Sequence, residues 1–406
     1  MPASTPHATA GVAFALGLIM LIGPASIDMY LPFIPAIAAE LHSSYAAVQW
    51  SLTVFLLAMG GGQLVFGPVI DAFGRRMPLL AALAAFVLAS GLAAAAPGLD
   101  ALVLARLLQG LAASLAIVTA MSTVRDVAEG VRAAQIFALL MTIQGIGPVL
   151  APAVGGLIGS GFGWRAVFVA LALLGVVVLA VAFALLSETL PRHRRTTLRP
   201  AEVMRGYGAI LSDGRFVLPG LALSAVFVFL FSYIGGAAEA YQGSFGVSAR
   251  SFGFIFGATG LAVLLGAMAS ARLVAGVPVQ RLALAGVLAI LAGTGLALLT
   301  SLAGLGLPWI VAGMFIALAG LGLAETMLTS IALATRSTAL GASAALLGAG
   351  SLLLGALATP LAAVAIQAGV LPWLGFLTIS ALAATGLTLA STRMVARSGL
   401  AVGLHQ

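Results

Sequence analysis

The sequence predicts an all-α integral membrane protein. Of its 406 residues, 62% are hydrophobic and only 7% are charged, and the mean hydropathy is +1.19. A water-soluble domain cannot cover that much apolar surface, so lipid must solvate it. The apolar runs are about 20 residues long, which is the length that an α-helix needs to cross roughly 30 Å of hydrocarbon. Runs of this length exclude the shorter strands of a β-barrel.

Polar breaks divide the chain into twelve expected membrane-spanning helices. The first six occupy residues 10–36, 47–70, 78–96, 99–122, 134–159 and 164–186. The second six occupy residues 216–240, 251–272, 282–302, 307–334, 342–368 and 371–390. We expect these limits to hold to about four residues. The long polar stretch divides the spans six and six, which predicts an N-terminal half (1–186), a central cytoplasmic loop (187–215) and a C-terminal half (216–406).

The positions of the basic residues indicate the orientation. All 18 are arginines, because the chain contains no lysine. With a cytoplasmic N-terminus, 15 of them fall inside, Arg165 and Arg250 fall outside, and Arg106 lies within a span. Basic residues concentrate in cytoplasmic loops, so we expect both termini in the cytoplasm. The expected localisation is the bacterial inner membrane, which the chain crosses several times. Anionic inner-leaflet lipids then explain the net charge of +7 without nucleic acid.

The composition also argues against several other classes. The chain has no cysteine, four scattered histidines and no Gly-rich phosphate loop followed by Lys-Ser/Thr. We therefore expect no metal site, no thiol chemistry and no ATP-driven step within this chain. No nucleophile, base and orienting group recur together, so neither an enzyme nor a bound cofactor is expected. The segment 1–7 lacks the basic patch of a signal peptide, so the first span should remain in the protein.

The most informative motif lies between the second and third spans and reads Gly67-Pro-Val-Ile-Asp71-Ala-Phe-Gly74-Arg75-Arg76. An ordinary basic loop explains the two arginines, but not an acid and two glycines at this spacing. The Asp71 carboxylate can accept from a neighbouring helix end or pair with an arginine, and so lock one face of the bundle. We expect a gating role for Gly67, Asp71, Gly74, Arg75 and Arg76.

The fifth span contains an unusual set of helix-distorting and small residues: Gly147, Pro148, Pro152, Gly155 and Gly156. Proline removes a helical hydrogen bond, and glycine lets a neighbouring backbone approach closely. The helix is therefore expected to bend and slide at the interface between the halves, as a gate requires. Close static packing is the alternative explanation for the same residues.

Two of these segments resemble elements of the major facilitator superfamily. The hairpin motif resembles the loop between helices two and three in that superfamily, and Arg106-Leu-Leu-Gln109-Gly110 in the fourth span is similar to its R-x-x-Q-G element. This resemblance implies the major facilitator fold, in which twelve transmembrane helices form two six-helix halves. It also implies that Gln109 and Gly110 take part in gating, and that the transporter is a monomer.

Other segments resemble a narrower group. The pattern of residues 145–156, followed by Trp164-Arg165-x-x-Phe168, resembles the signature of drug–proton antiporters. Residues 26–32 (Ser-Ile-Asp-Met-Tyr-Leu-Pro) and 341–348 look like the Bcr/CflA drug-resistance subfamily. The resemblance implies that the proton gradient is the energy source, and it places Tyr30 in the substrate or proton site. The segment Glu239-Ala-Tyr241 in the seventh span resembles Asp28-Met-Tyr30 in the first span. This short similarity is consistent with two related halves.

Four ionisable residues fall at span depth: Asp28, Arg106, Glu239 and Glu325. A charge there costs roughly 2.5–3.5 kcal/mol on insertion scales, so each should pair or face a wet cavity. We expect Asp28 to bind the transported proton and Arg106 to pair with it at similar depth, with a structural hydrogen bond and static packing as the alternatives. Glu325 is expected to line the cavity with Thr326, Thr329 and Ser330, and Glu239 is expected near the outer mouth.

Three functions are weighed against these features. The antiporter motif and the apolar spans favour proton-coupled efflux of hydrophobic or amphiphilic drugs by alternating access. A proton-coupled transporter of a small metabolite, such as a nucleoside or sugar, would need more hydrogen-bonding side chains in its cavity. An intramembrane enzyme or scaffold is the third class, and energy-dependent dye efflux would exclude it. The expected partners are a small-molecule substrate, protons and membrane lipids.

Overall fold

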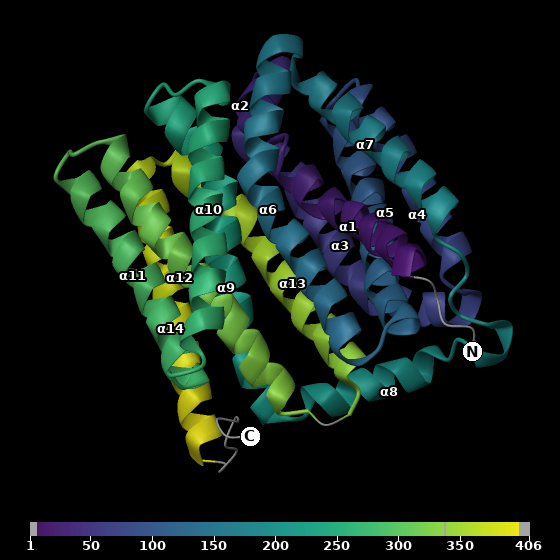
Figure 1. Ribbon diagram of the computed structural model, residues 1–406. Helices are drawn as coiled ribbons and strands as arrows, with labels where there is room; N and C mark the ends of the chain where they lie inside the picture. The colour runs from purple at the N-terminus through teal and green to yellow at the C-terminus, as the bar shows by residue number, and fades with distance from the viewer. Residues whose placement is uncertain (1–5, 337, 398–406) are drawn as a thin grey trace.

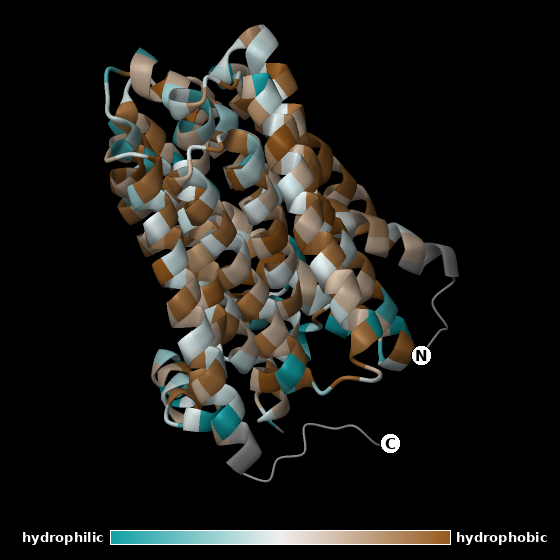
Figure 2. Cartoon of the chain, turned by 90° about the vertical axis from the view of Figure 1, so that its left-hand side faces the viewer, coloured by the Kyte–Doolittle hydropathy of each residue, from teal (hydrophilic) through white to brown (hydrophobic). Residues whose placement is uncertain are grey.

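The computed structural model describes residues 6–336 and 338–397. Twelve of its helices are long and apolar enough to cross a membrane, so the predicted fold class is confirmed. The helices stand side by side in one bundle (Figure 1). Hydrophobic residues cover most of their length, and polar residues gather towards the two ends of the bundle (Figure 2). The expectations about the two chain ends concern residues 1–5 and 398–406, which lie outside the described part.

The N-terminal half contains the first six spans. Its elements are α1 (Pro6–Asp28), η1 (Leu31–Phe33), α2 (Ile34–Glu40), α3 (Tyr45–Phe73), α4 (Arg76–Ala94), α5 (Leu99–Val127), α6 (Gly130–Phe162) and α7 (Trp164–Leu185). The first span is broken rather than continuous. α1 ends at Asp28 and a 3-10 turn follows, since Pro32 and Pro35 cannot donate helical hydrogen bonds. The break lies directly beside an expected site residue.

The C-terminal half contains the other six spans. Its elements are α9 (Gly214–Glu239), the π-helical turn η3 (Ala240–Ser244), α10 (Ala249–Leu273), α11 (Val279–Leu302), α12 (Leu307–Ala334), α13 (Leu340–Gln367) and α14 (Val370–Arg397). Most helix limits agree with the hydropathy limits to within four residues. α5 and α14 extend further, to Val127 and Arg397, because a helix can continue past the hydrocarbon into polar sequence.

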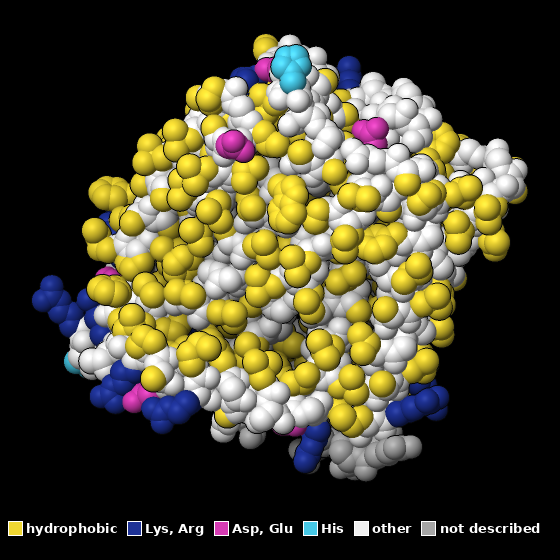
Figure 3. Space-filling view, turned by 180° about the vertical axis from the view of Figure 1, so that it is seen from behind, with side chains coloured by type: hydrophobic (Ala, Val, Ile, Leu, Met, Phe, Trp, Pro, Cys, Tyr) yellow, Lys and Arg dark blue, Asp and Glu magenta, His cyan; other side chains and the backbone are white. Residues whose placement is uncertain are grey.

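The segment between the halves was expected to be a loop, but it contains the short turn η2 (Arg192–Arg194) and the helix α8 (Pro200–Leu211). α8 runs across one end of the bundle, beneath both halves (Figure 1). We call this end the linker end, and the opposite end the far end. The arginines visible from behind lie mostly along the linker end (Figure 3).

The two halves touch along two pairs of helices, α3 with α13 and α6 with α10. Smaller contacts between the halves join η1 and α2 to α9 and α10, and the other extensive contacts join helices of the same half. Large apolar side chains such as Leu88, which is 68% exposed, face outward. On a soluble protein such a surface would cause aggregation, whereas lipid solvates it here. This arrangement leaves the space between the halves as the place where a solute can be enclosed.

Candidate functional site

A cavity of about 1230 Å³ lies between the halves and reaches the linker end. Helices α1, α3, α5 and α6 line it on one side, α9, α12 and α13 line it on the other, and α8 lies across its opening. Many of the lining side chains are apolar and include Met20, Met59, Met121, Phe137 and Phe227. Such a chamber suits a solute with a large apolar body.

Glu325 lines this cavity, as the sequence predicts. It precedes the end of α12 at Ala334 by nine residues, which places it roughly 14 Å from the linker end by helical rise. Thr329 lines the cavity one turn closer to that end. Thr326 and Ser330 do not line it, and the Thr326 hydroxyl donates to the carbonyl of Gly322 at 2.9 Å instead. The expected polar stripe is therefore reduced to two residues.

Asp28 lies outside the cavity lining, towards the far end. It is the last residue of α1, and only 3% of its surface is exposed. The expected pairing with Arg106 is absent, since no ion pair joins the two residues in the described part of the chain. Similar depth along two helices does not bring two side chains together, because each helix also has to turn the relevant face inward.

Arg106 is instead enclosed by aromatic rings. Its guanidinium carbon lies 4.5 Å from the ring centre of Tyr30, 4.2 Å from that of Phe55 and 5.9 Å from that of Phe168. Cation–π attraction of this kind stabilises a charge that is withdrawn from water. Its Nη1 donates to Gln109, whose amide donates to Ser90 at 2.8 Å. The Nε and Nη2 groups are buried and have no hydrogen-bond partner in the described part of the chain.

The similarity between the segments that begin at Asp28 and at Glu239 is also visible in the structure. Asp28 ends α1 and Glu239 ends α9, and an irregular helical turn follows each of them. Tyr30 and Tyr241, two residues further on, are fully buried. Glu239 is only partly buried and lies near the far end, as expected. Neither Glu239 nor Tyr30 lines the cavity that reaches the linker end.

The hairpin motif forms an ion cluster at the linker end. Nη1 of Arg75 lies 2.7 Å from Oδ1 of Asp71, and its Nε donates to Asp126 of α5 at 2.9 Å. Gly74 has φ = +98°, and a Cβ there would press against Glu188 and Arg195. Glycine is therefore required at this position both by conformation and by space. The whole cluster joins elements of the N-terminal half and the linker, and Asp71 makes no ion pair with the C-terminal half among the described residues.

Glu188 holds the linker against this hairpin. Its carboxylate accepts from the backbone N–H of Arg75 at 2.9 Å, of Leu190 at 2.9 Å and of Arg76 at 3.4 Å. Partial burial disfavours the charged form, but these N–H groups outweigh it and hold the pKa of Glu188 below its ordinary value. Arg76 also donates to the carbonyl of Phe183 at 3.1 Å. Arg75 and Arg76, the two arginines of the hairpin motif, are thus both held in place by polar contacts.

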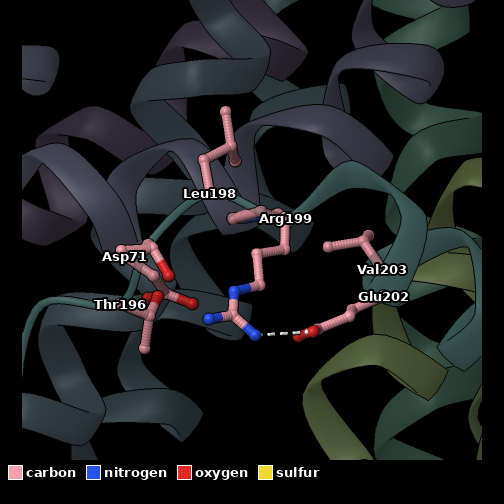
Figure 4. A pocket seen from close by; sticks show the side chains of 8 residues that line it. Asp71, Thr196, Leu198, Arg199, Glu202 and Val203 are labelled. Atoms are coloured by element: carbon pink, nitrogen blue, oxygen red, sulfur yellow. Dashed lines mark hydrogen bonds and ion pairs between the residues drawn. The ribbon is translucent and has the colours of Figure 1, made fainter.

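A smaller hollow of about 210 Å³ lies next to Asp71. Figure 4 shows Asp71 and Thr196 on one side of it, with Arg199 extended towards Glu202 of α8. The backbone N–H of Thr196 donates to the carbonyl of Asp71 at 3.1 Å. The linker is therefore attached directly to the end of α3.

The small residues of α6 have different partners. A Cβ at Gly147 would overlap Pro24, and one at Gly155 would overlap the carbonyl of Met29. Both partners belong to the N-terminal half, so the expectation that Gly155 lets the two halves approach each other closely is wrong. Gly156 does face the other half, where a Cβ would lie 3.2 Å from the carbonyl oxygen of Ala249 in α10.

The contact between α6 and α10 depends on glycines that the sequence analysis did not single out: Gly253, Gly257 and Gly260. They receive the carbonyl oxygens of Pro152, Val149 and Pro148, respectively, where any Cβ would collide. Pro152 lacks an N–H, so the Pro148 carbonyl has no helical partner and rests against Gly260 instead. The spacing Gly-x-x-x-Gly-x-x-Gly in α10 was a readable signal of close helix approach.

Two other glycines of the motifs behave differently from each other. A Cβ at Gly110 would overlap the backbone carbonyl of Phe55, so Gly110 lets α5 and α3 approach closely. Gly67 lines the cavity, and a Cβ there would meet no heavy atom within 4 Å. Space alone therefore does not require glycine at position 67.

At the far end, the halves are joined by hydrogen bonds. Tyr45 and Gln49 both donate to the carbonyl of Gly235, at 3.0 and 2.9 Å. The hydroxyl oxygens of Thr53 and Thr359 lie 2.6 Å apart. These residues of α3 follow a spacing of four, a polar stripe that the sequence displays within an apolar span. Gln242 adds a bond to the carbonyl of Pro32 at 2.8 Å.

A twelve-span bundle with a cavity that reaches one end, and with hydrogen bonds that close the other end, defines a multi-pass membrane transporter. The chain belongs to the Major Facilitator Superfamily, whose family model matches residues 16–344. The expected superfamily is therefore confirmed, while the narrower Bcr/CflA resemblance remains a prediction.

Two relatives place the chain within this superfamily. It is 38% identical over 265 residues to the uncharacterized MFS-type transporter YdgK of Bacillus subtilis, which covers 64% of this chain and 65% of that one. It is 34% identical over 218 residues to the multidrug resistance protein MdtL of Escherichia coli O9:H4, which covers 54% of this chain and 55% of that one. The chain thus matches less than two thirds of the length of either relative.

Solved structures show the same fold. A bacterial homologue of the human lysosomal transporter Spinster, in an inward-facing and unoccupied conformation, has a TM-score of 0.74 and 17% identity over 99% of this chain and 100% of that chain. A point mutant of the nucleoside transporter NupG has a TM-score of 0.74 and 14% identity over 94% of this chain and 99% of that chain. At these identities the likeness concerns the fold alone.

Proposed function

We propose that the protein exports hydrophobic or amphiphilic molecules across the bacterial inner membrane in exchange for protons. The observation that carries this proposal is the largely apolar cavity of about 1230 Å³ between the halves, closed at the far end and reaching the linker end. Its size exceeds the range of roughly 300–1,000 Å³ that is typical of ligand pockets, which suits varied substrates with apolar bodies. The name of the relative MdtL supports the same class.

The linker end faces the cytoplasm in this proposal. Arginines concentrate at that end, as the face in Figure 3 shows, and basic residues are retained on the cytoplasmic side during insertion. The cavity is then loaded from the cytoplasm, and opening of the far end releases the solute outside.

Asp28 is the proposed proton carrier. Its burial beside a helix break, away from the cytoplasm-facing cavity, places it where opening of the far end would expose it. If one proton enters for each neutral molecule expelled, a potential of about 100 mV supplies about 2.3 kcal/mol, and one pH unit supplies about 1.4 kcal/mol more. Together they sustain roughly a 500-fold gradient of the exported molecule.

Proteoliposomes with an imposed pH gradient test the proposal. We expect the parent protein to drive uphill transport, and Asp28→Asn to keep only downhill exchange, because the cavity survives while the carrier is lost. Asp100→Asn, at the exposed start of α5, is the matched control and should transport normally. Uphill transport by Asp28→Asn at the parent rate would remove Asp28 from the mechanism.

A small metabolite such as a nucleoside or sugar is the second candidate. The side chains of Gln63, Gln144 and Thr329 line the cavity and can hydrogen-bond a polar solute. The test measures dye uptake in the same proteoliposomes while nucleosides or sugars are added as competitors. Inhibition of lipophilic dye uptake by these solutes favours this candidate over drug export.

A further inference from the structure

The cavity contains one carboxylate that no other described group of the protein neutralises. Four charged residues line it: Asp71, Arg75, Arg125 and Glu325. Asp71 and Arg75 form an ion pair with each other. Arg125 lies two residues before the end of α5, at the linker end, where it donates to Ser122 at 3.2 Å. Glu325 is thus the one charged residue of this set that lies deep in the cavity.

No hydrogen bond or ion pair to the Glu325 side chain occurs within the described residues. The helices packed against α12 bring no charge near it either, because their charged residues lie in terminal turns. These residues are Arg215 and Glu239 of α9, Arg250 and Arg272 of α10, and Arg281 of α11, while α13 carries none. The carboxylate therefore has no counter-charge among the residues that the structure describes.

The surroundings of Glu325 are those of a site for an apolar cation. A carboxylate in an apolar cavity is costly unless it binds a proton or a positive charge. The thioethers of Met20, Met59 and Met121 can adapt to apolar bodies of different shapes, and the rings of Phe137 and Phe227 can also attract a cation. An anionic solute gains nothing at this depth, because the guanidinium of Arg125 lies at the opening.

We propose that Glu325 is the counter-charge for amphiphilic cations, such as protonated amines or quaternary ammonium and phosphonium ions, held in this cavity. The inference rests on the proposed export function for its biological meaning, although binding itself can be measured without transport. Thr329, one turn away on the same helix, provides a neutral polar neighbour.

Equilibrium binding to the purified full chain in lipid nanodiscs tests this assignment. The probes are tetraphenylphosphonium and its uncharged relative triphenylphosphine oxide. We expect the parent protein to bind the cation at least tenfold more tightly. Glu325→Gln should weaken cation binding by about 10- to 100-fold, as loss of a charged partner implies, and leave the binding of the oxide within about twofold. Thr326→Val is the matched control and should preserve the preference for the cation, because that hydroxyl bonds to the carbonyl of Gly322 and does not line the cavity.

Two results would overturn the assignment: equal affinity of the parent protein for both probes, or unchanged cation binding by Glu325→Gln. If Glu325→Gln does not fold, as judged by thermal unfolding, Glu325→Asp serves in its place and must retain the preference for the cation. Transport separates this inference from the proposed function. If cation binding depends on Glu325 but no proton-driven transport occurs, the export function is refuted and the cation site stands. If the oxide is transported uphill but binding does not depend on charge, the cation site is refuted and the export function stands.

Discussion

The hydroxyl oxygens of Thr53 and Thr359 lie 2.6 Å apart, and they join α3 of one half to α13 of the other. Closer to the far end, Tyr45 and Gln49 share the carbonyl of Gly235. These contacts all lie on the side where the cavity is closed. Because they must break before that side can open, they contribute to the preference for the conformation that faces the linker end.

Thr53→Val should favour the conformation that is open at the far end. A buried hydrogen bond contributes about 0.5–1.5 kcal/mol, so we expect the ratio of far-end-open to far-end-closed protein to rise roughly 2- to 13-fold. The chain has no cysteine, so spin labels on Asp100→Cys and Leu305→Cys report the separation of the halves by pulsed electron resonance. Thr142→Val is the control, since that hydroxyl bonds only within α6, and an equal shift in both variants would contradict the explanation.

Asp71→Asn should abolish most transport and leave membrane insertion intact. The variant loses the 2.7 Å pair with Arg75, but Arg75 keeps its bond to Asp126, so the fold should lose at most about 1 kcal/mol. Thermal unfolding and dye efflux in cells measure the two effects. Glu202→Gln removes another ion pair of the same surface, between Arg199 and Glu202, and should transport normally. Full transport by Asp71→Asn would show that the hairpin is only a structural anchor.

Gly155→Leu and Gly156→Leu should differ although they are neighbours. The first forces a side chain into the Met29 backbone of the same half, so it should lower stability by about 1–3 kcal/mol or prevent folding. The second pushes against α10, so it should chiefly change the separation of the halves and slow exchange. Gly161→Leu, with open space around it, is the control. The distinction fails if both variants lose equal stability in thermal unfolding.

The attachment of the linker should depend on pH through Glu188. Its pKa is lowered in the folded protein, so the stabilisation is fully present above the ordinary value of 4.5 and is lost as the pH falls through the lowered value. A spin label at Thr197→Cys should therefore be restricted at neutral pH and mobile in acid. With Glu188→Gln added, the label should be mobile at both pH values. Restriction that persists in this variant would assign the attachment to other contacts.

The number and placement of the spans followed from hydropathy, since lipid imposes the same length requirement on each span. α8 was missed because a helix of twelve residues at the surface of the bundle contributes no apolar run of membrane length. Its residues Val203, Tyr207 and Ile210 do repeat at helical spacing and line the cavity, so a search for amphipathic patterns would have found it.

The site was only partly predictable, for a different reason. The sequence showed which span carries Asp28 and which carries Arg106, but not that aromatic rings from three other segments of the chain would enclose the arginine. Pairing across a bundle depends on how each helix is rotated about its axis, and hydropathy does not determine that rotation for helices that are apolar on all sides. Glu325 was easier to place, because a carboxylate at this depth is tolerated only where it faces a cavity or a partner.

The three glycines of α10 that receive carbonyl oxygens from α6 also limit how the protein can move. A shift of α6 along its axis by one residue, about 1.5 Å, would carry each oxygen off its glycine and onto a neighbouring side chain. Rotation about the line of contact keeps all three oxygens against their glycines. The contact between α6 and α10 can therefore serve as the axis about which the halves rotate, while the two helices cannot slide along each other.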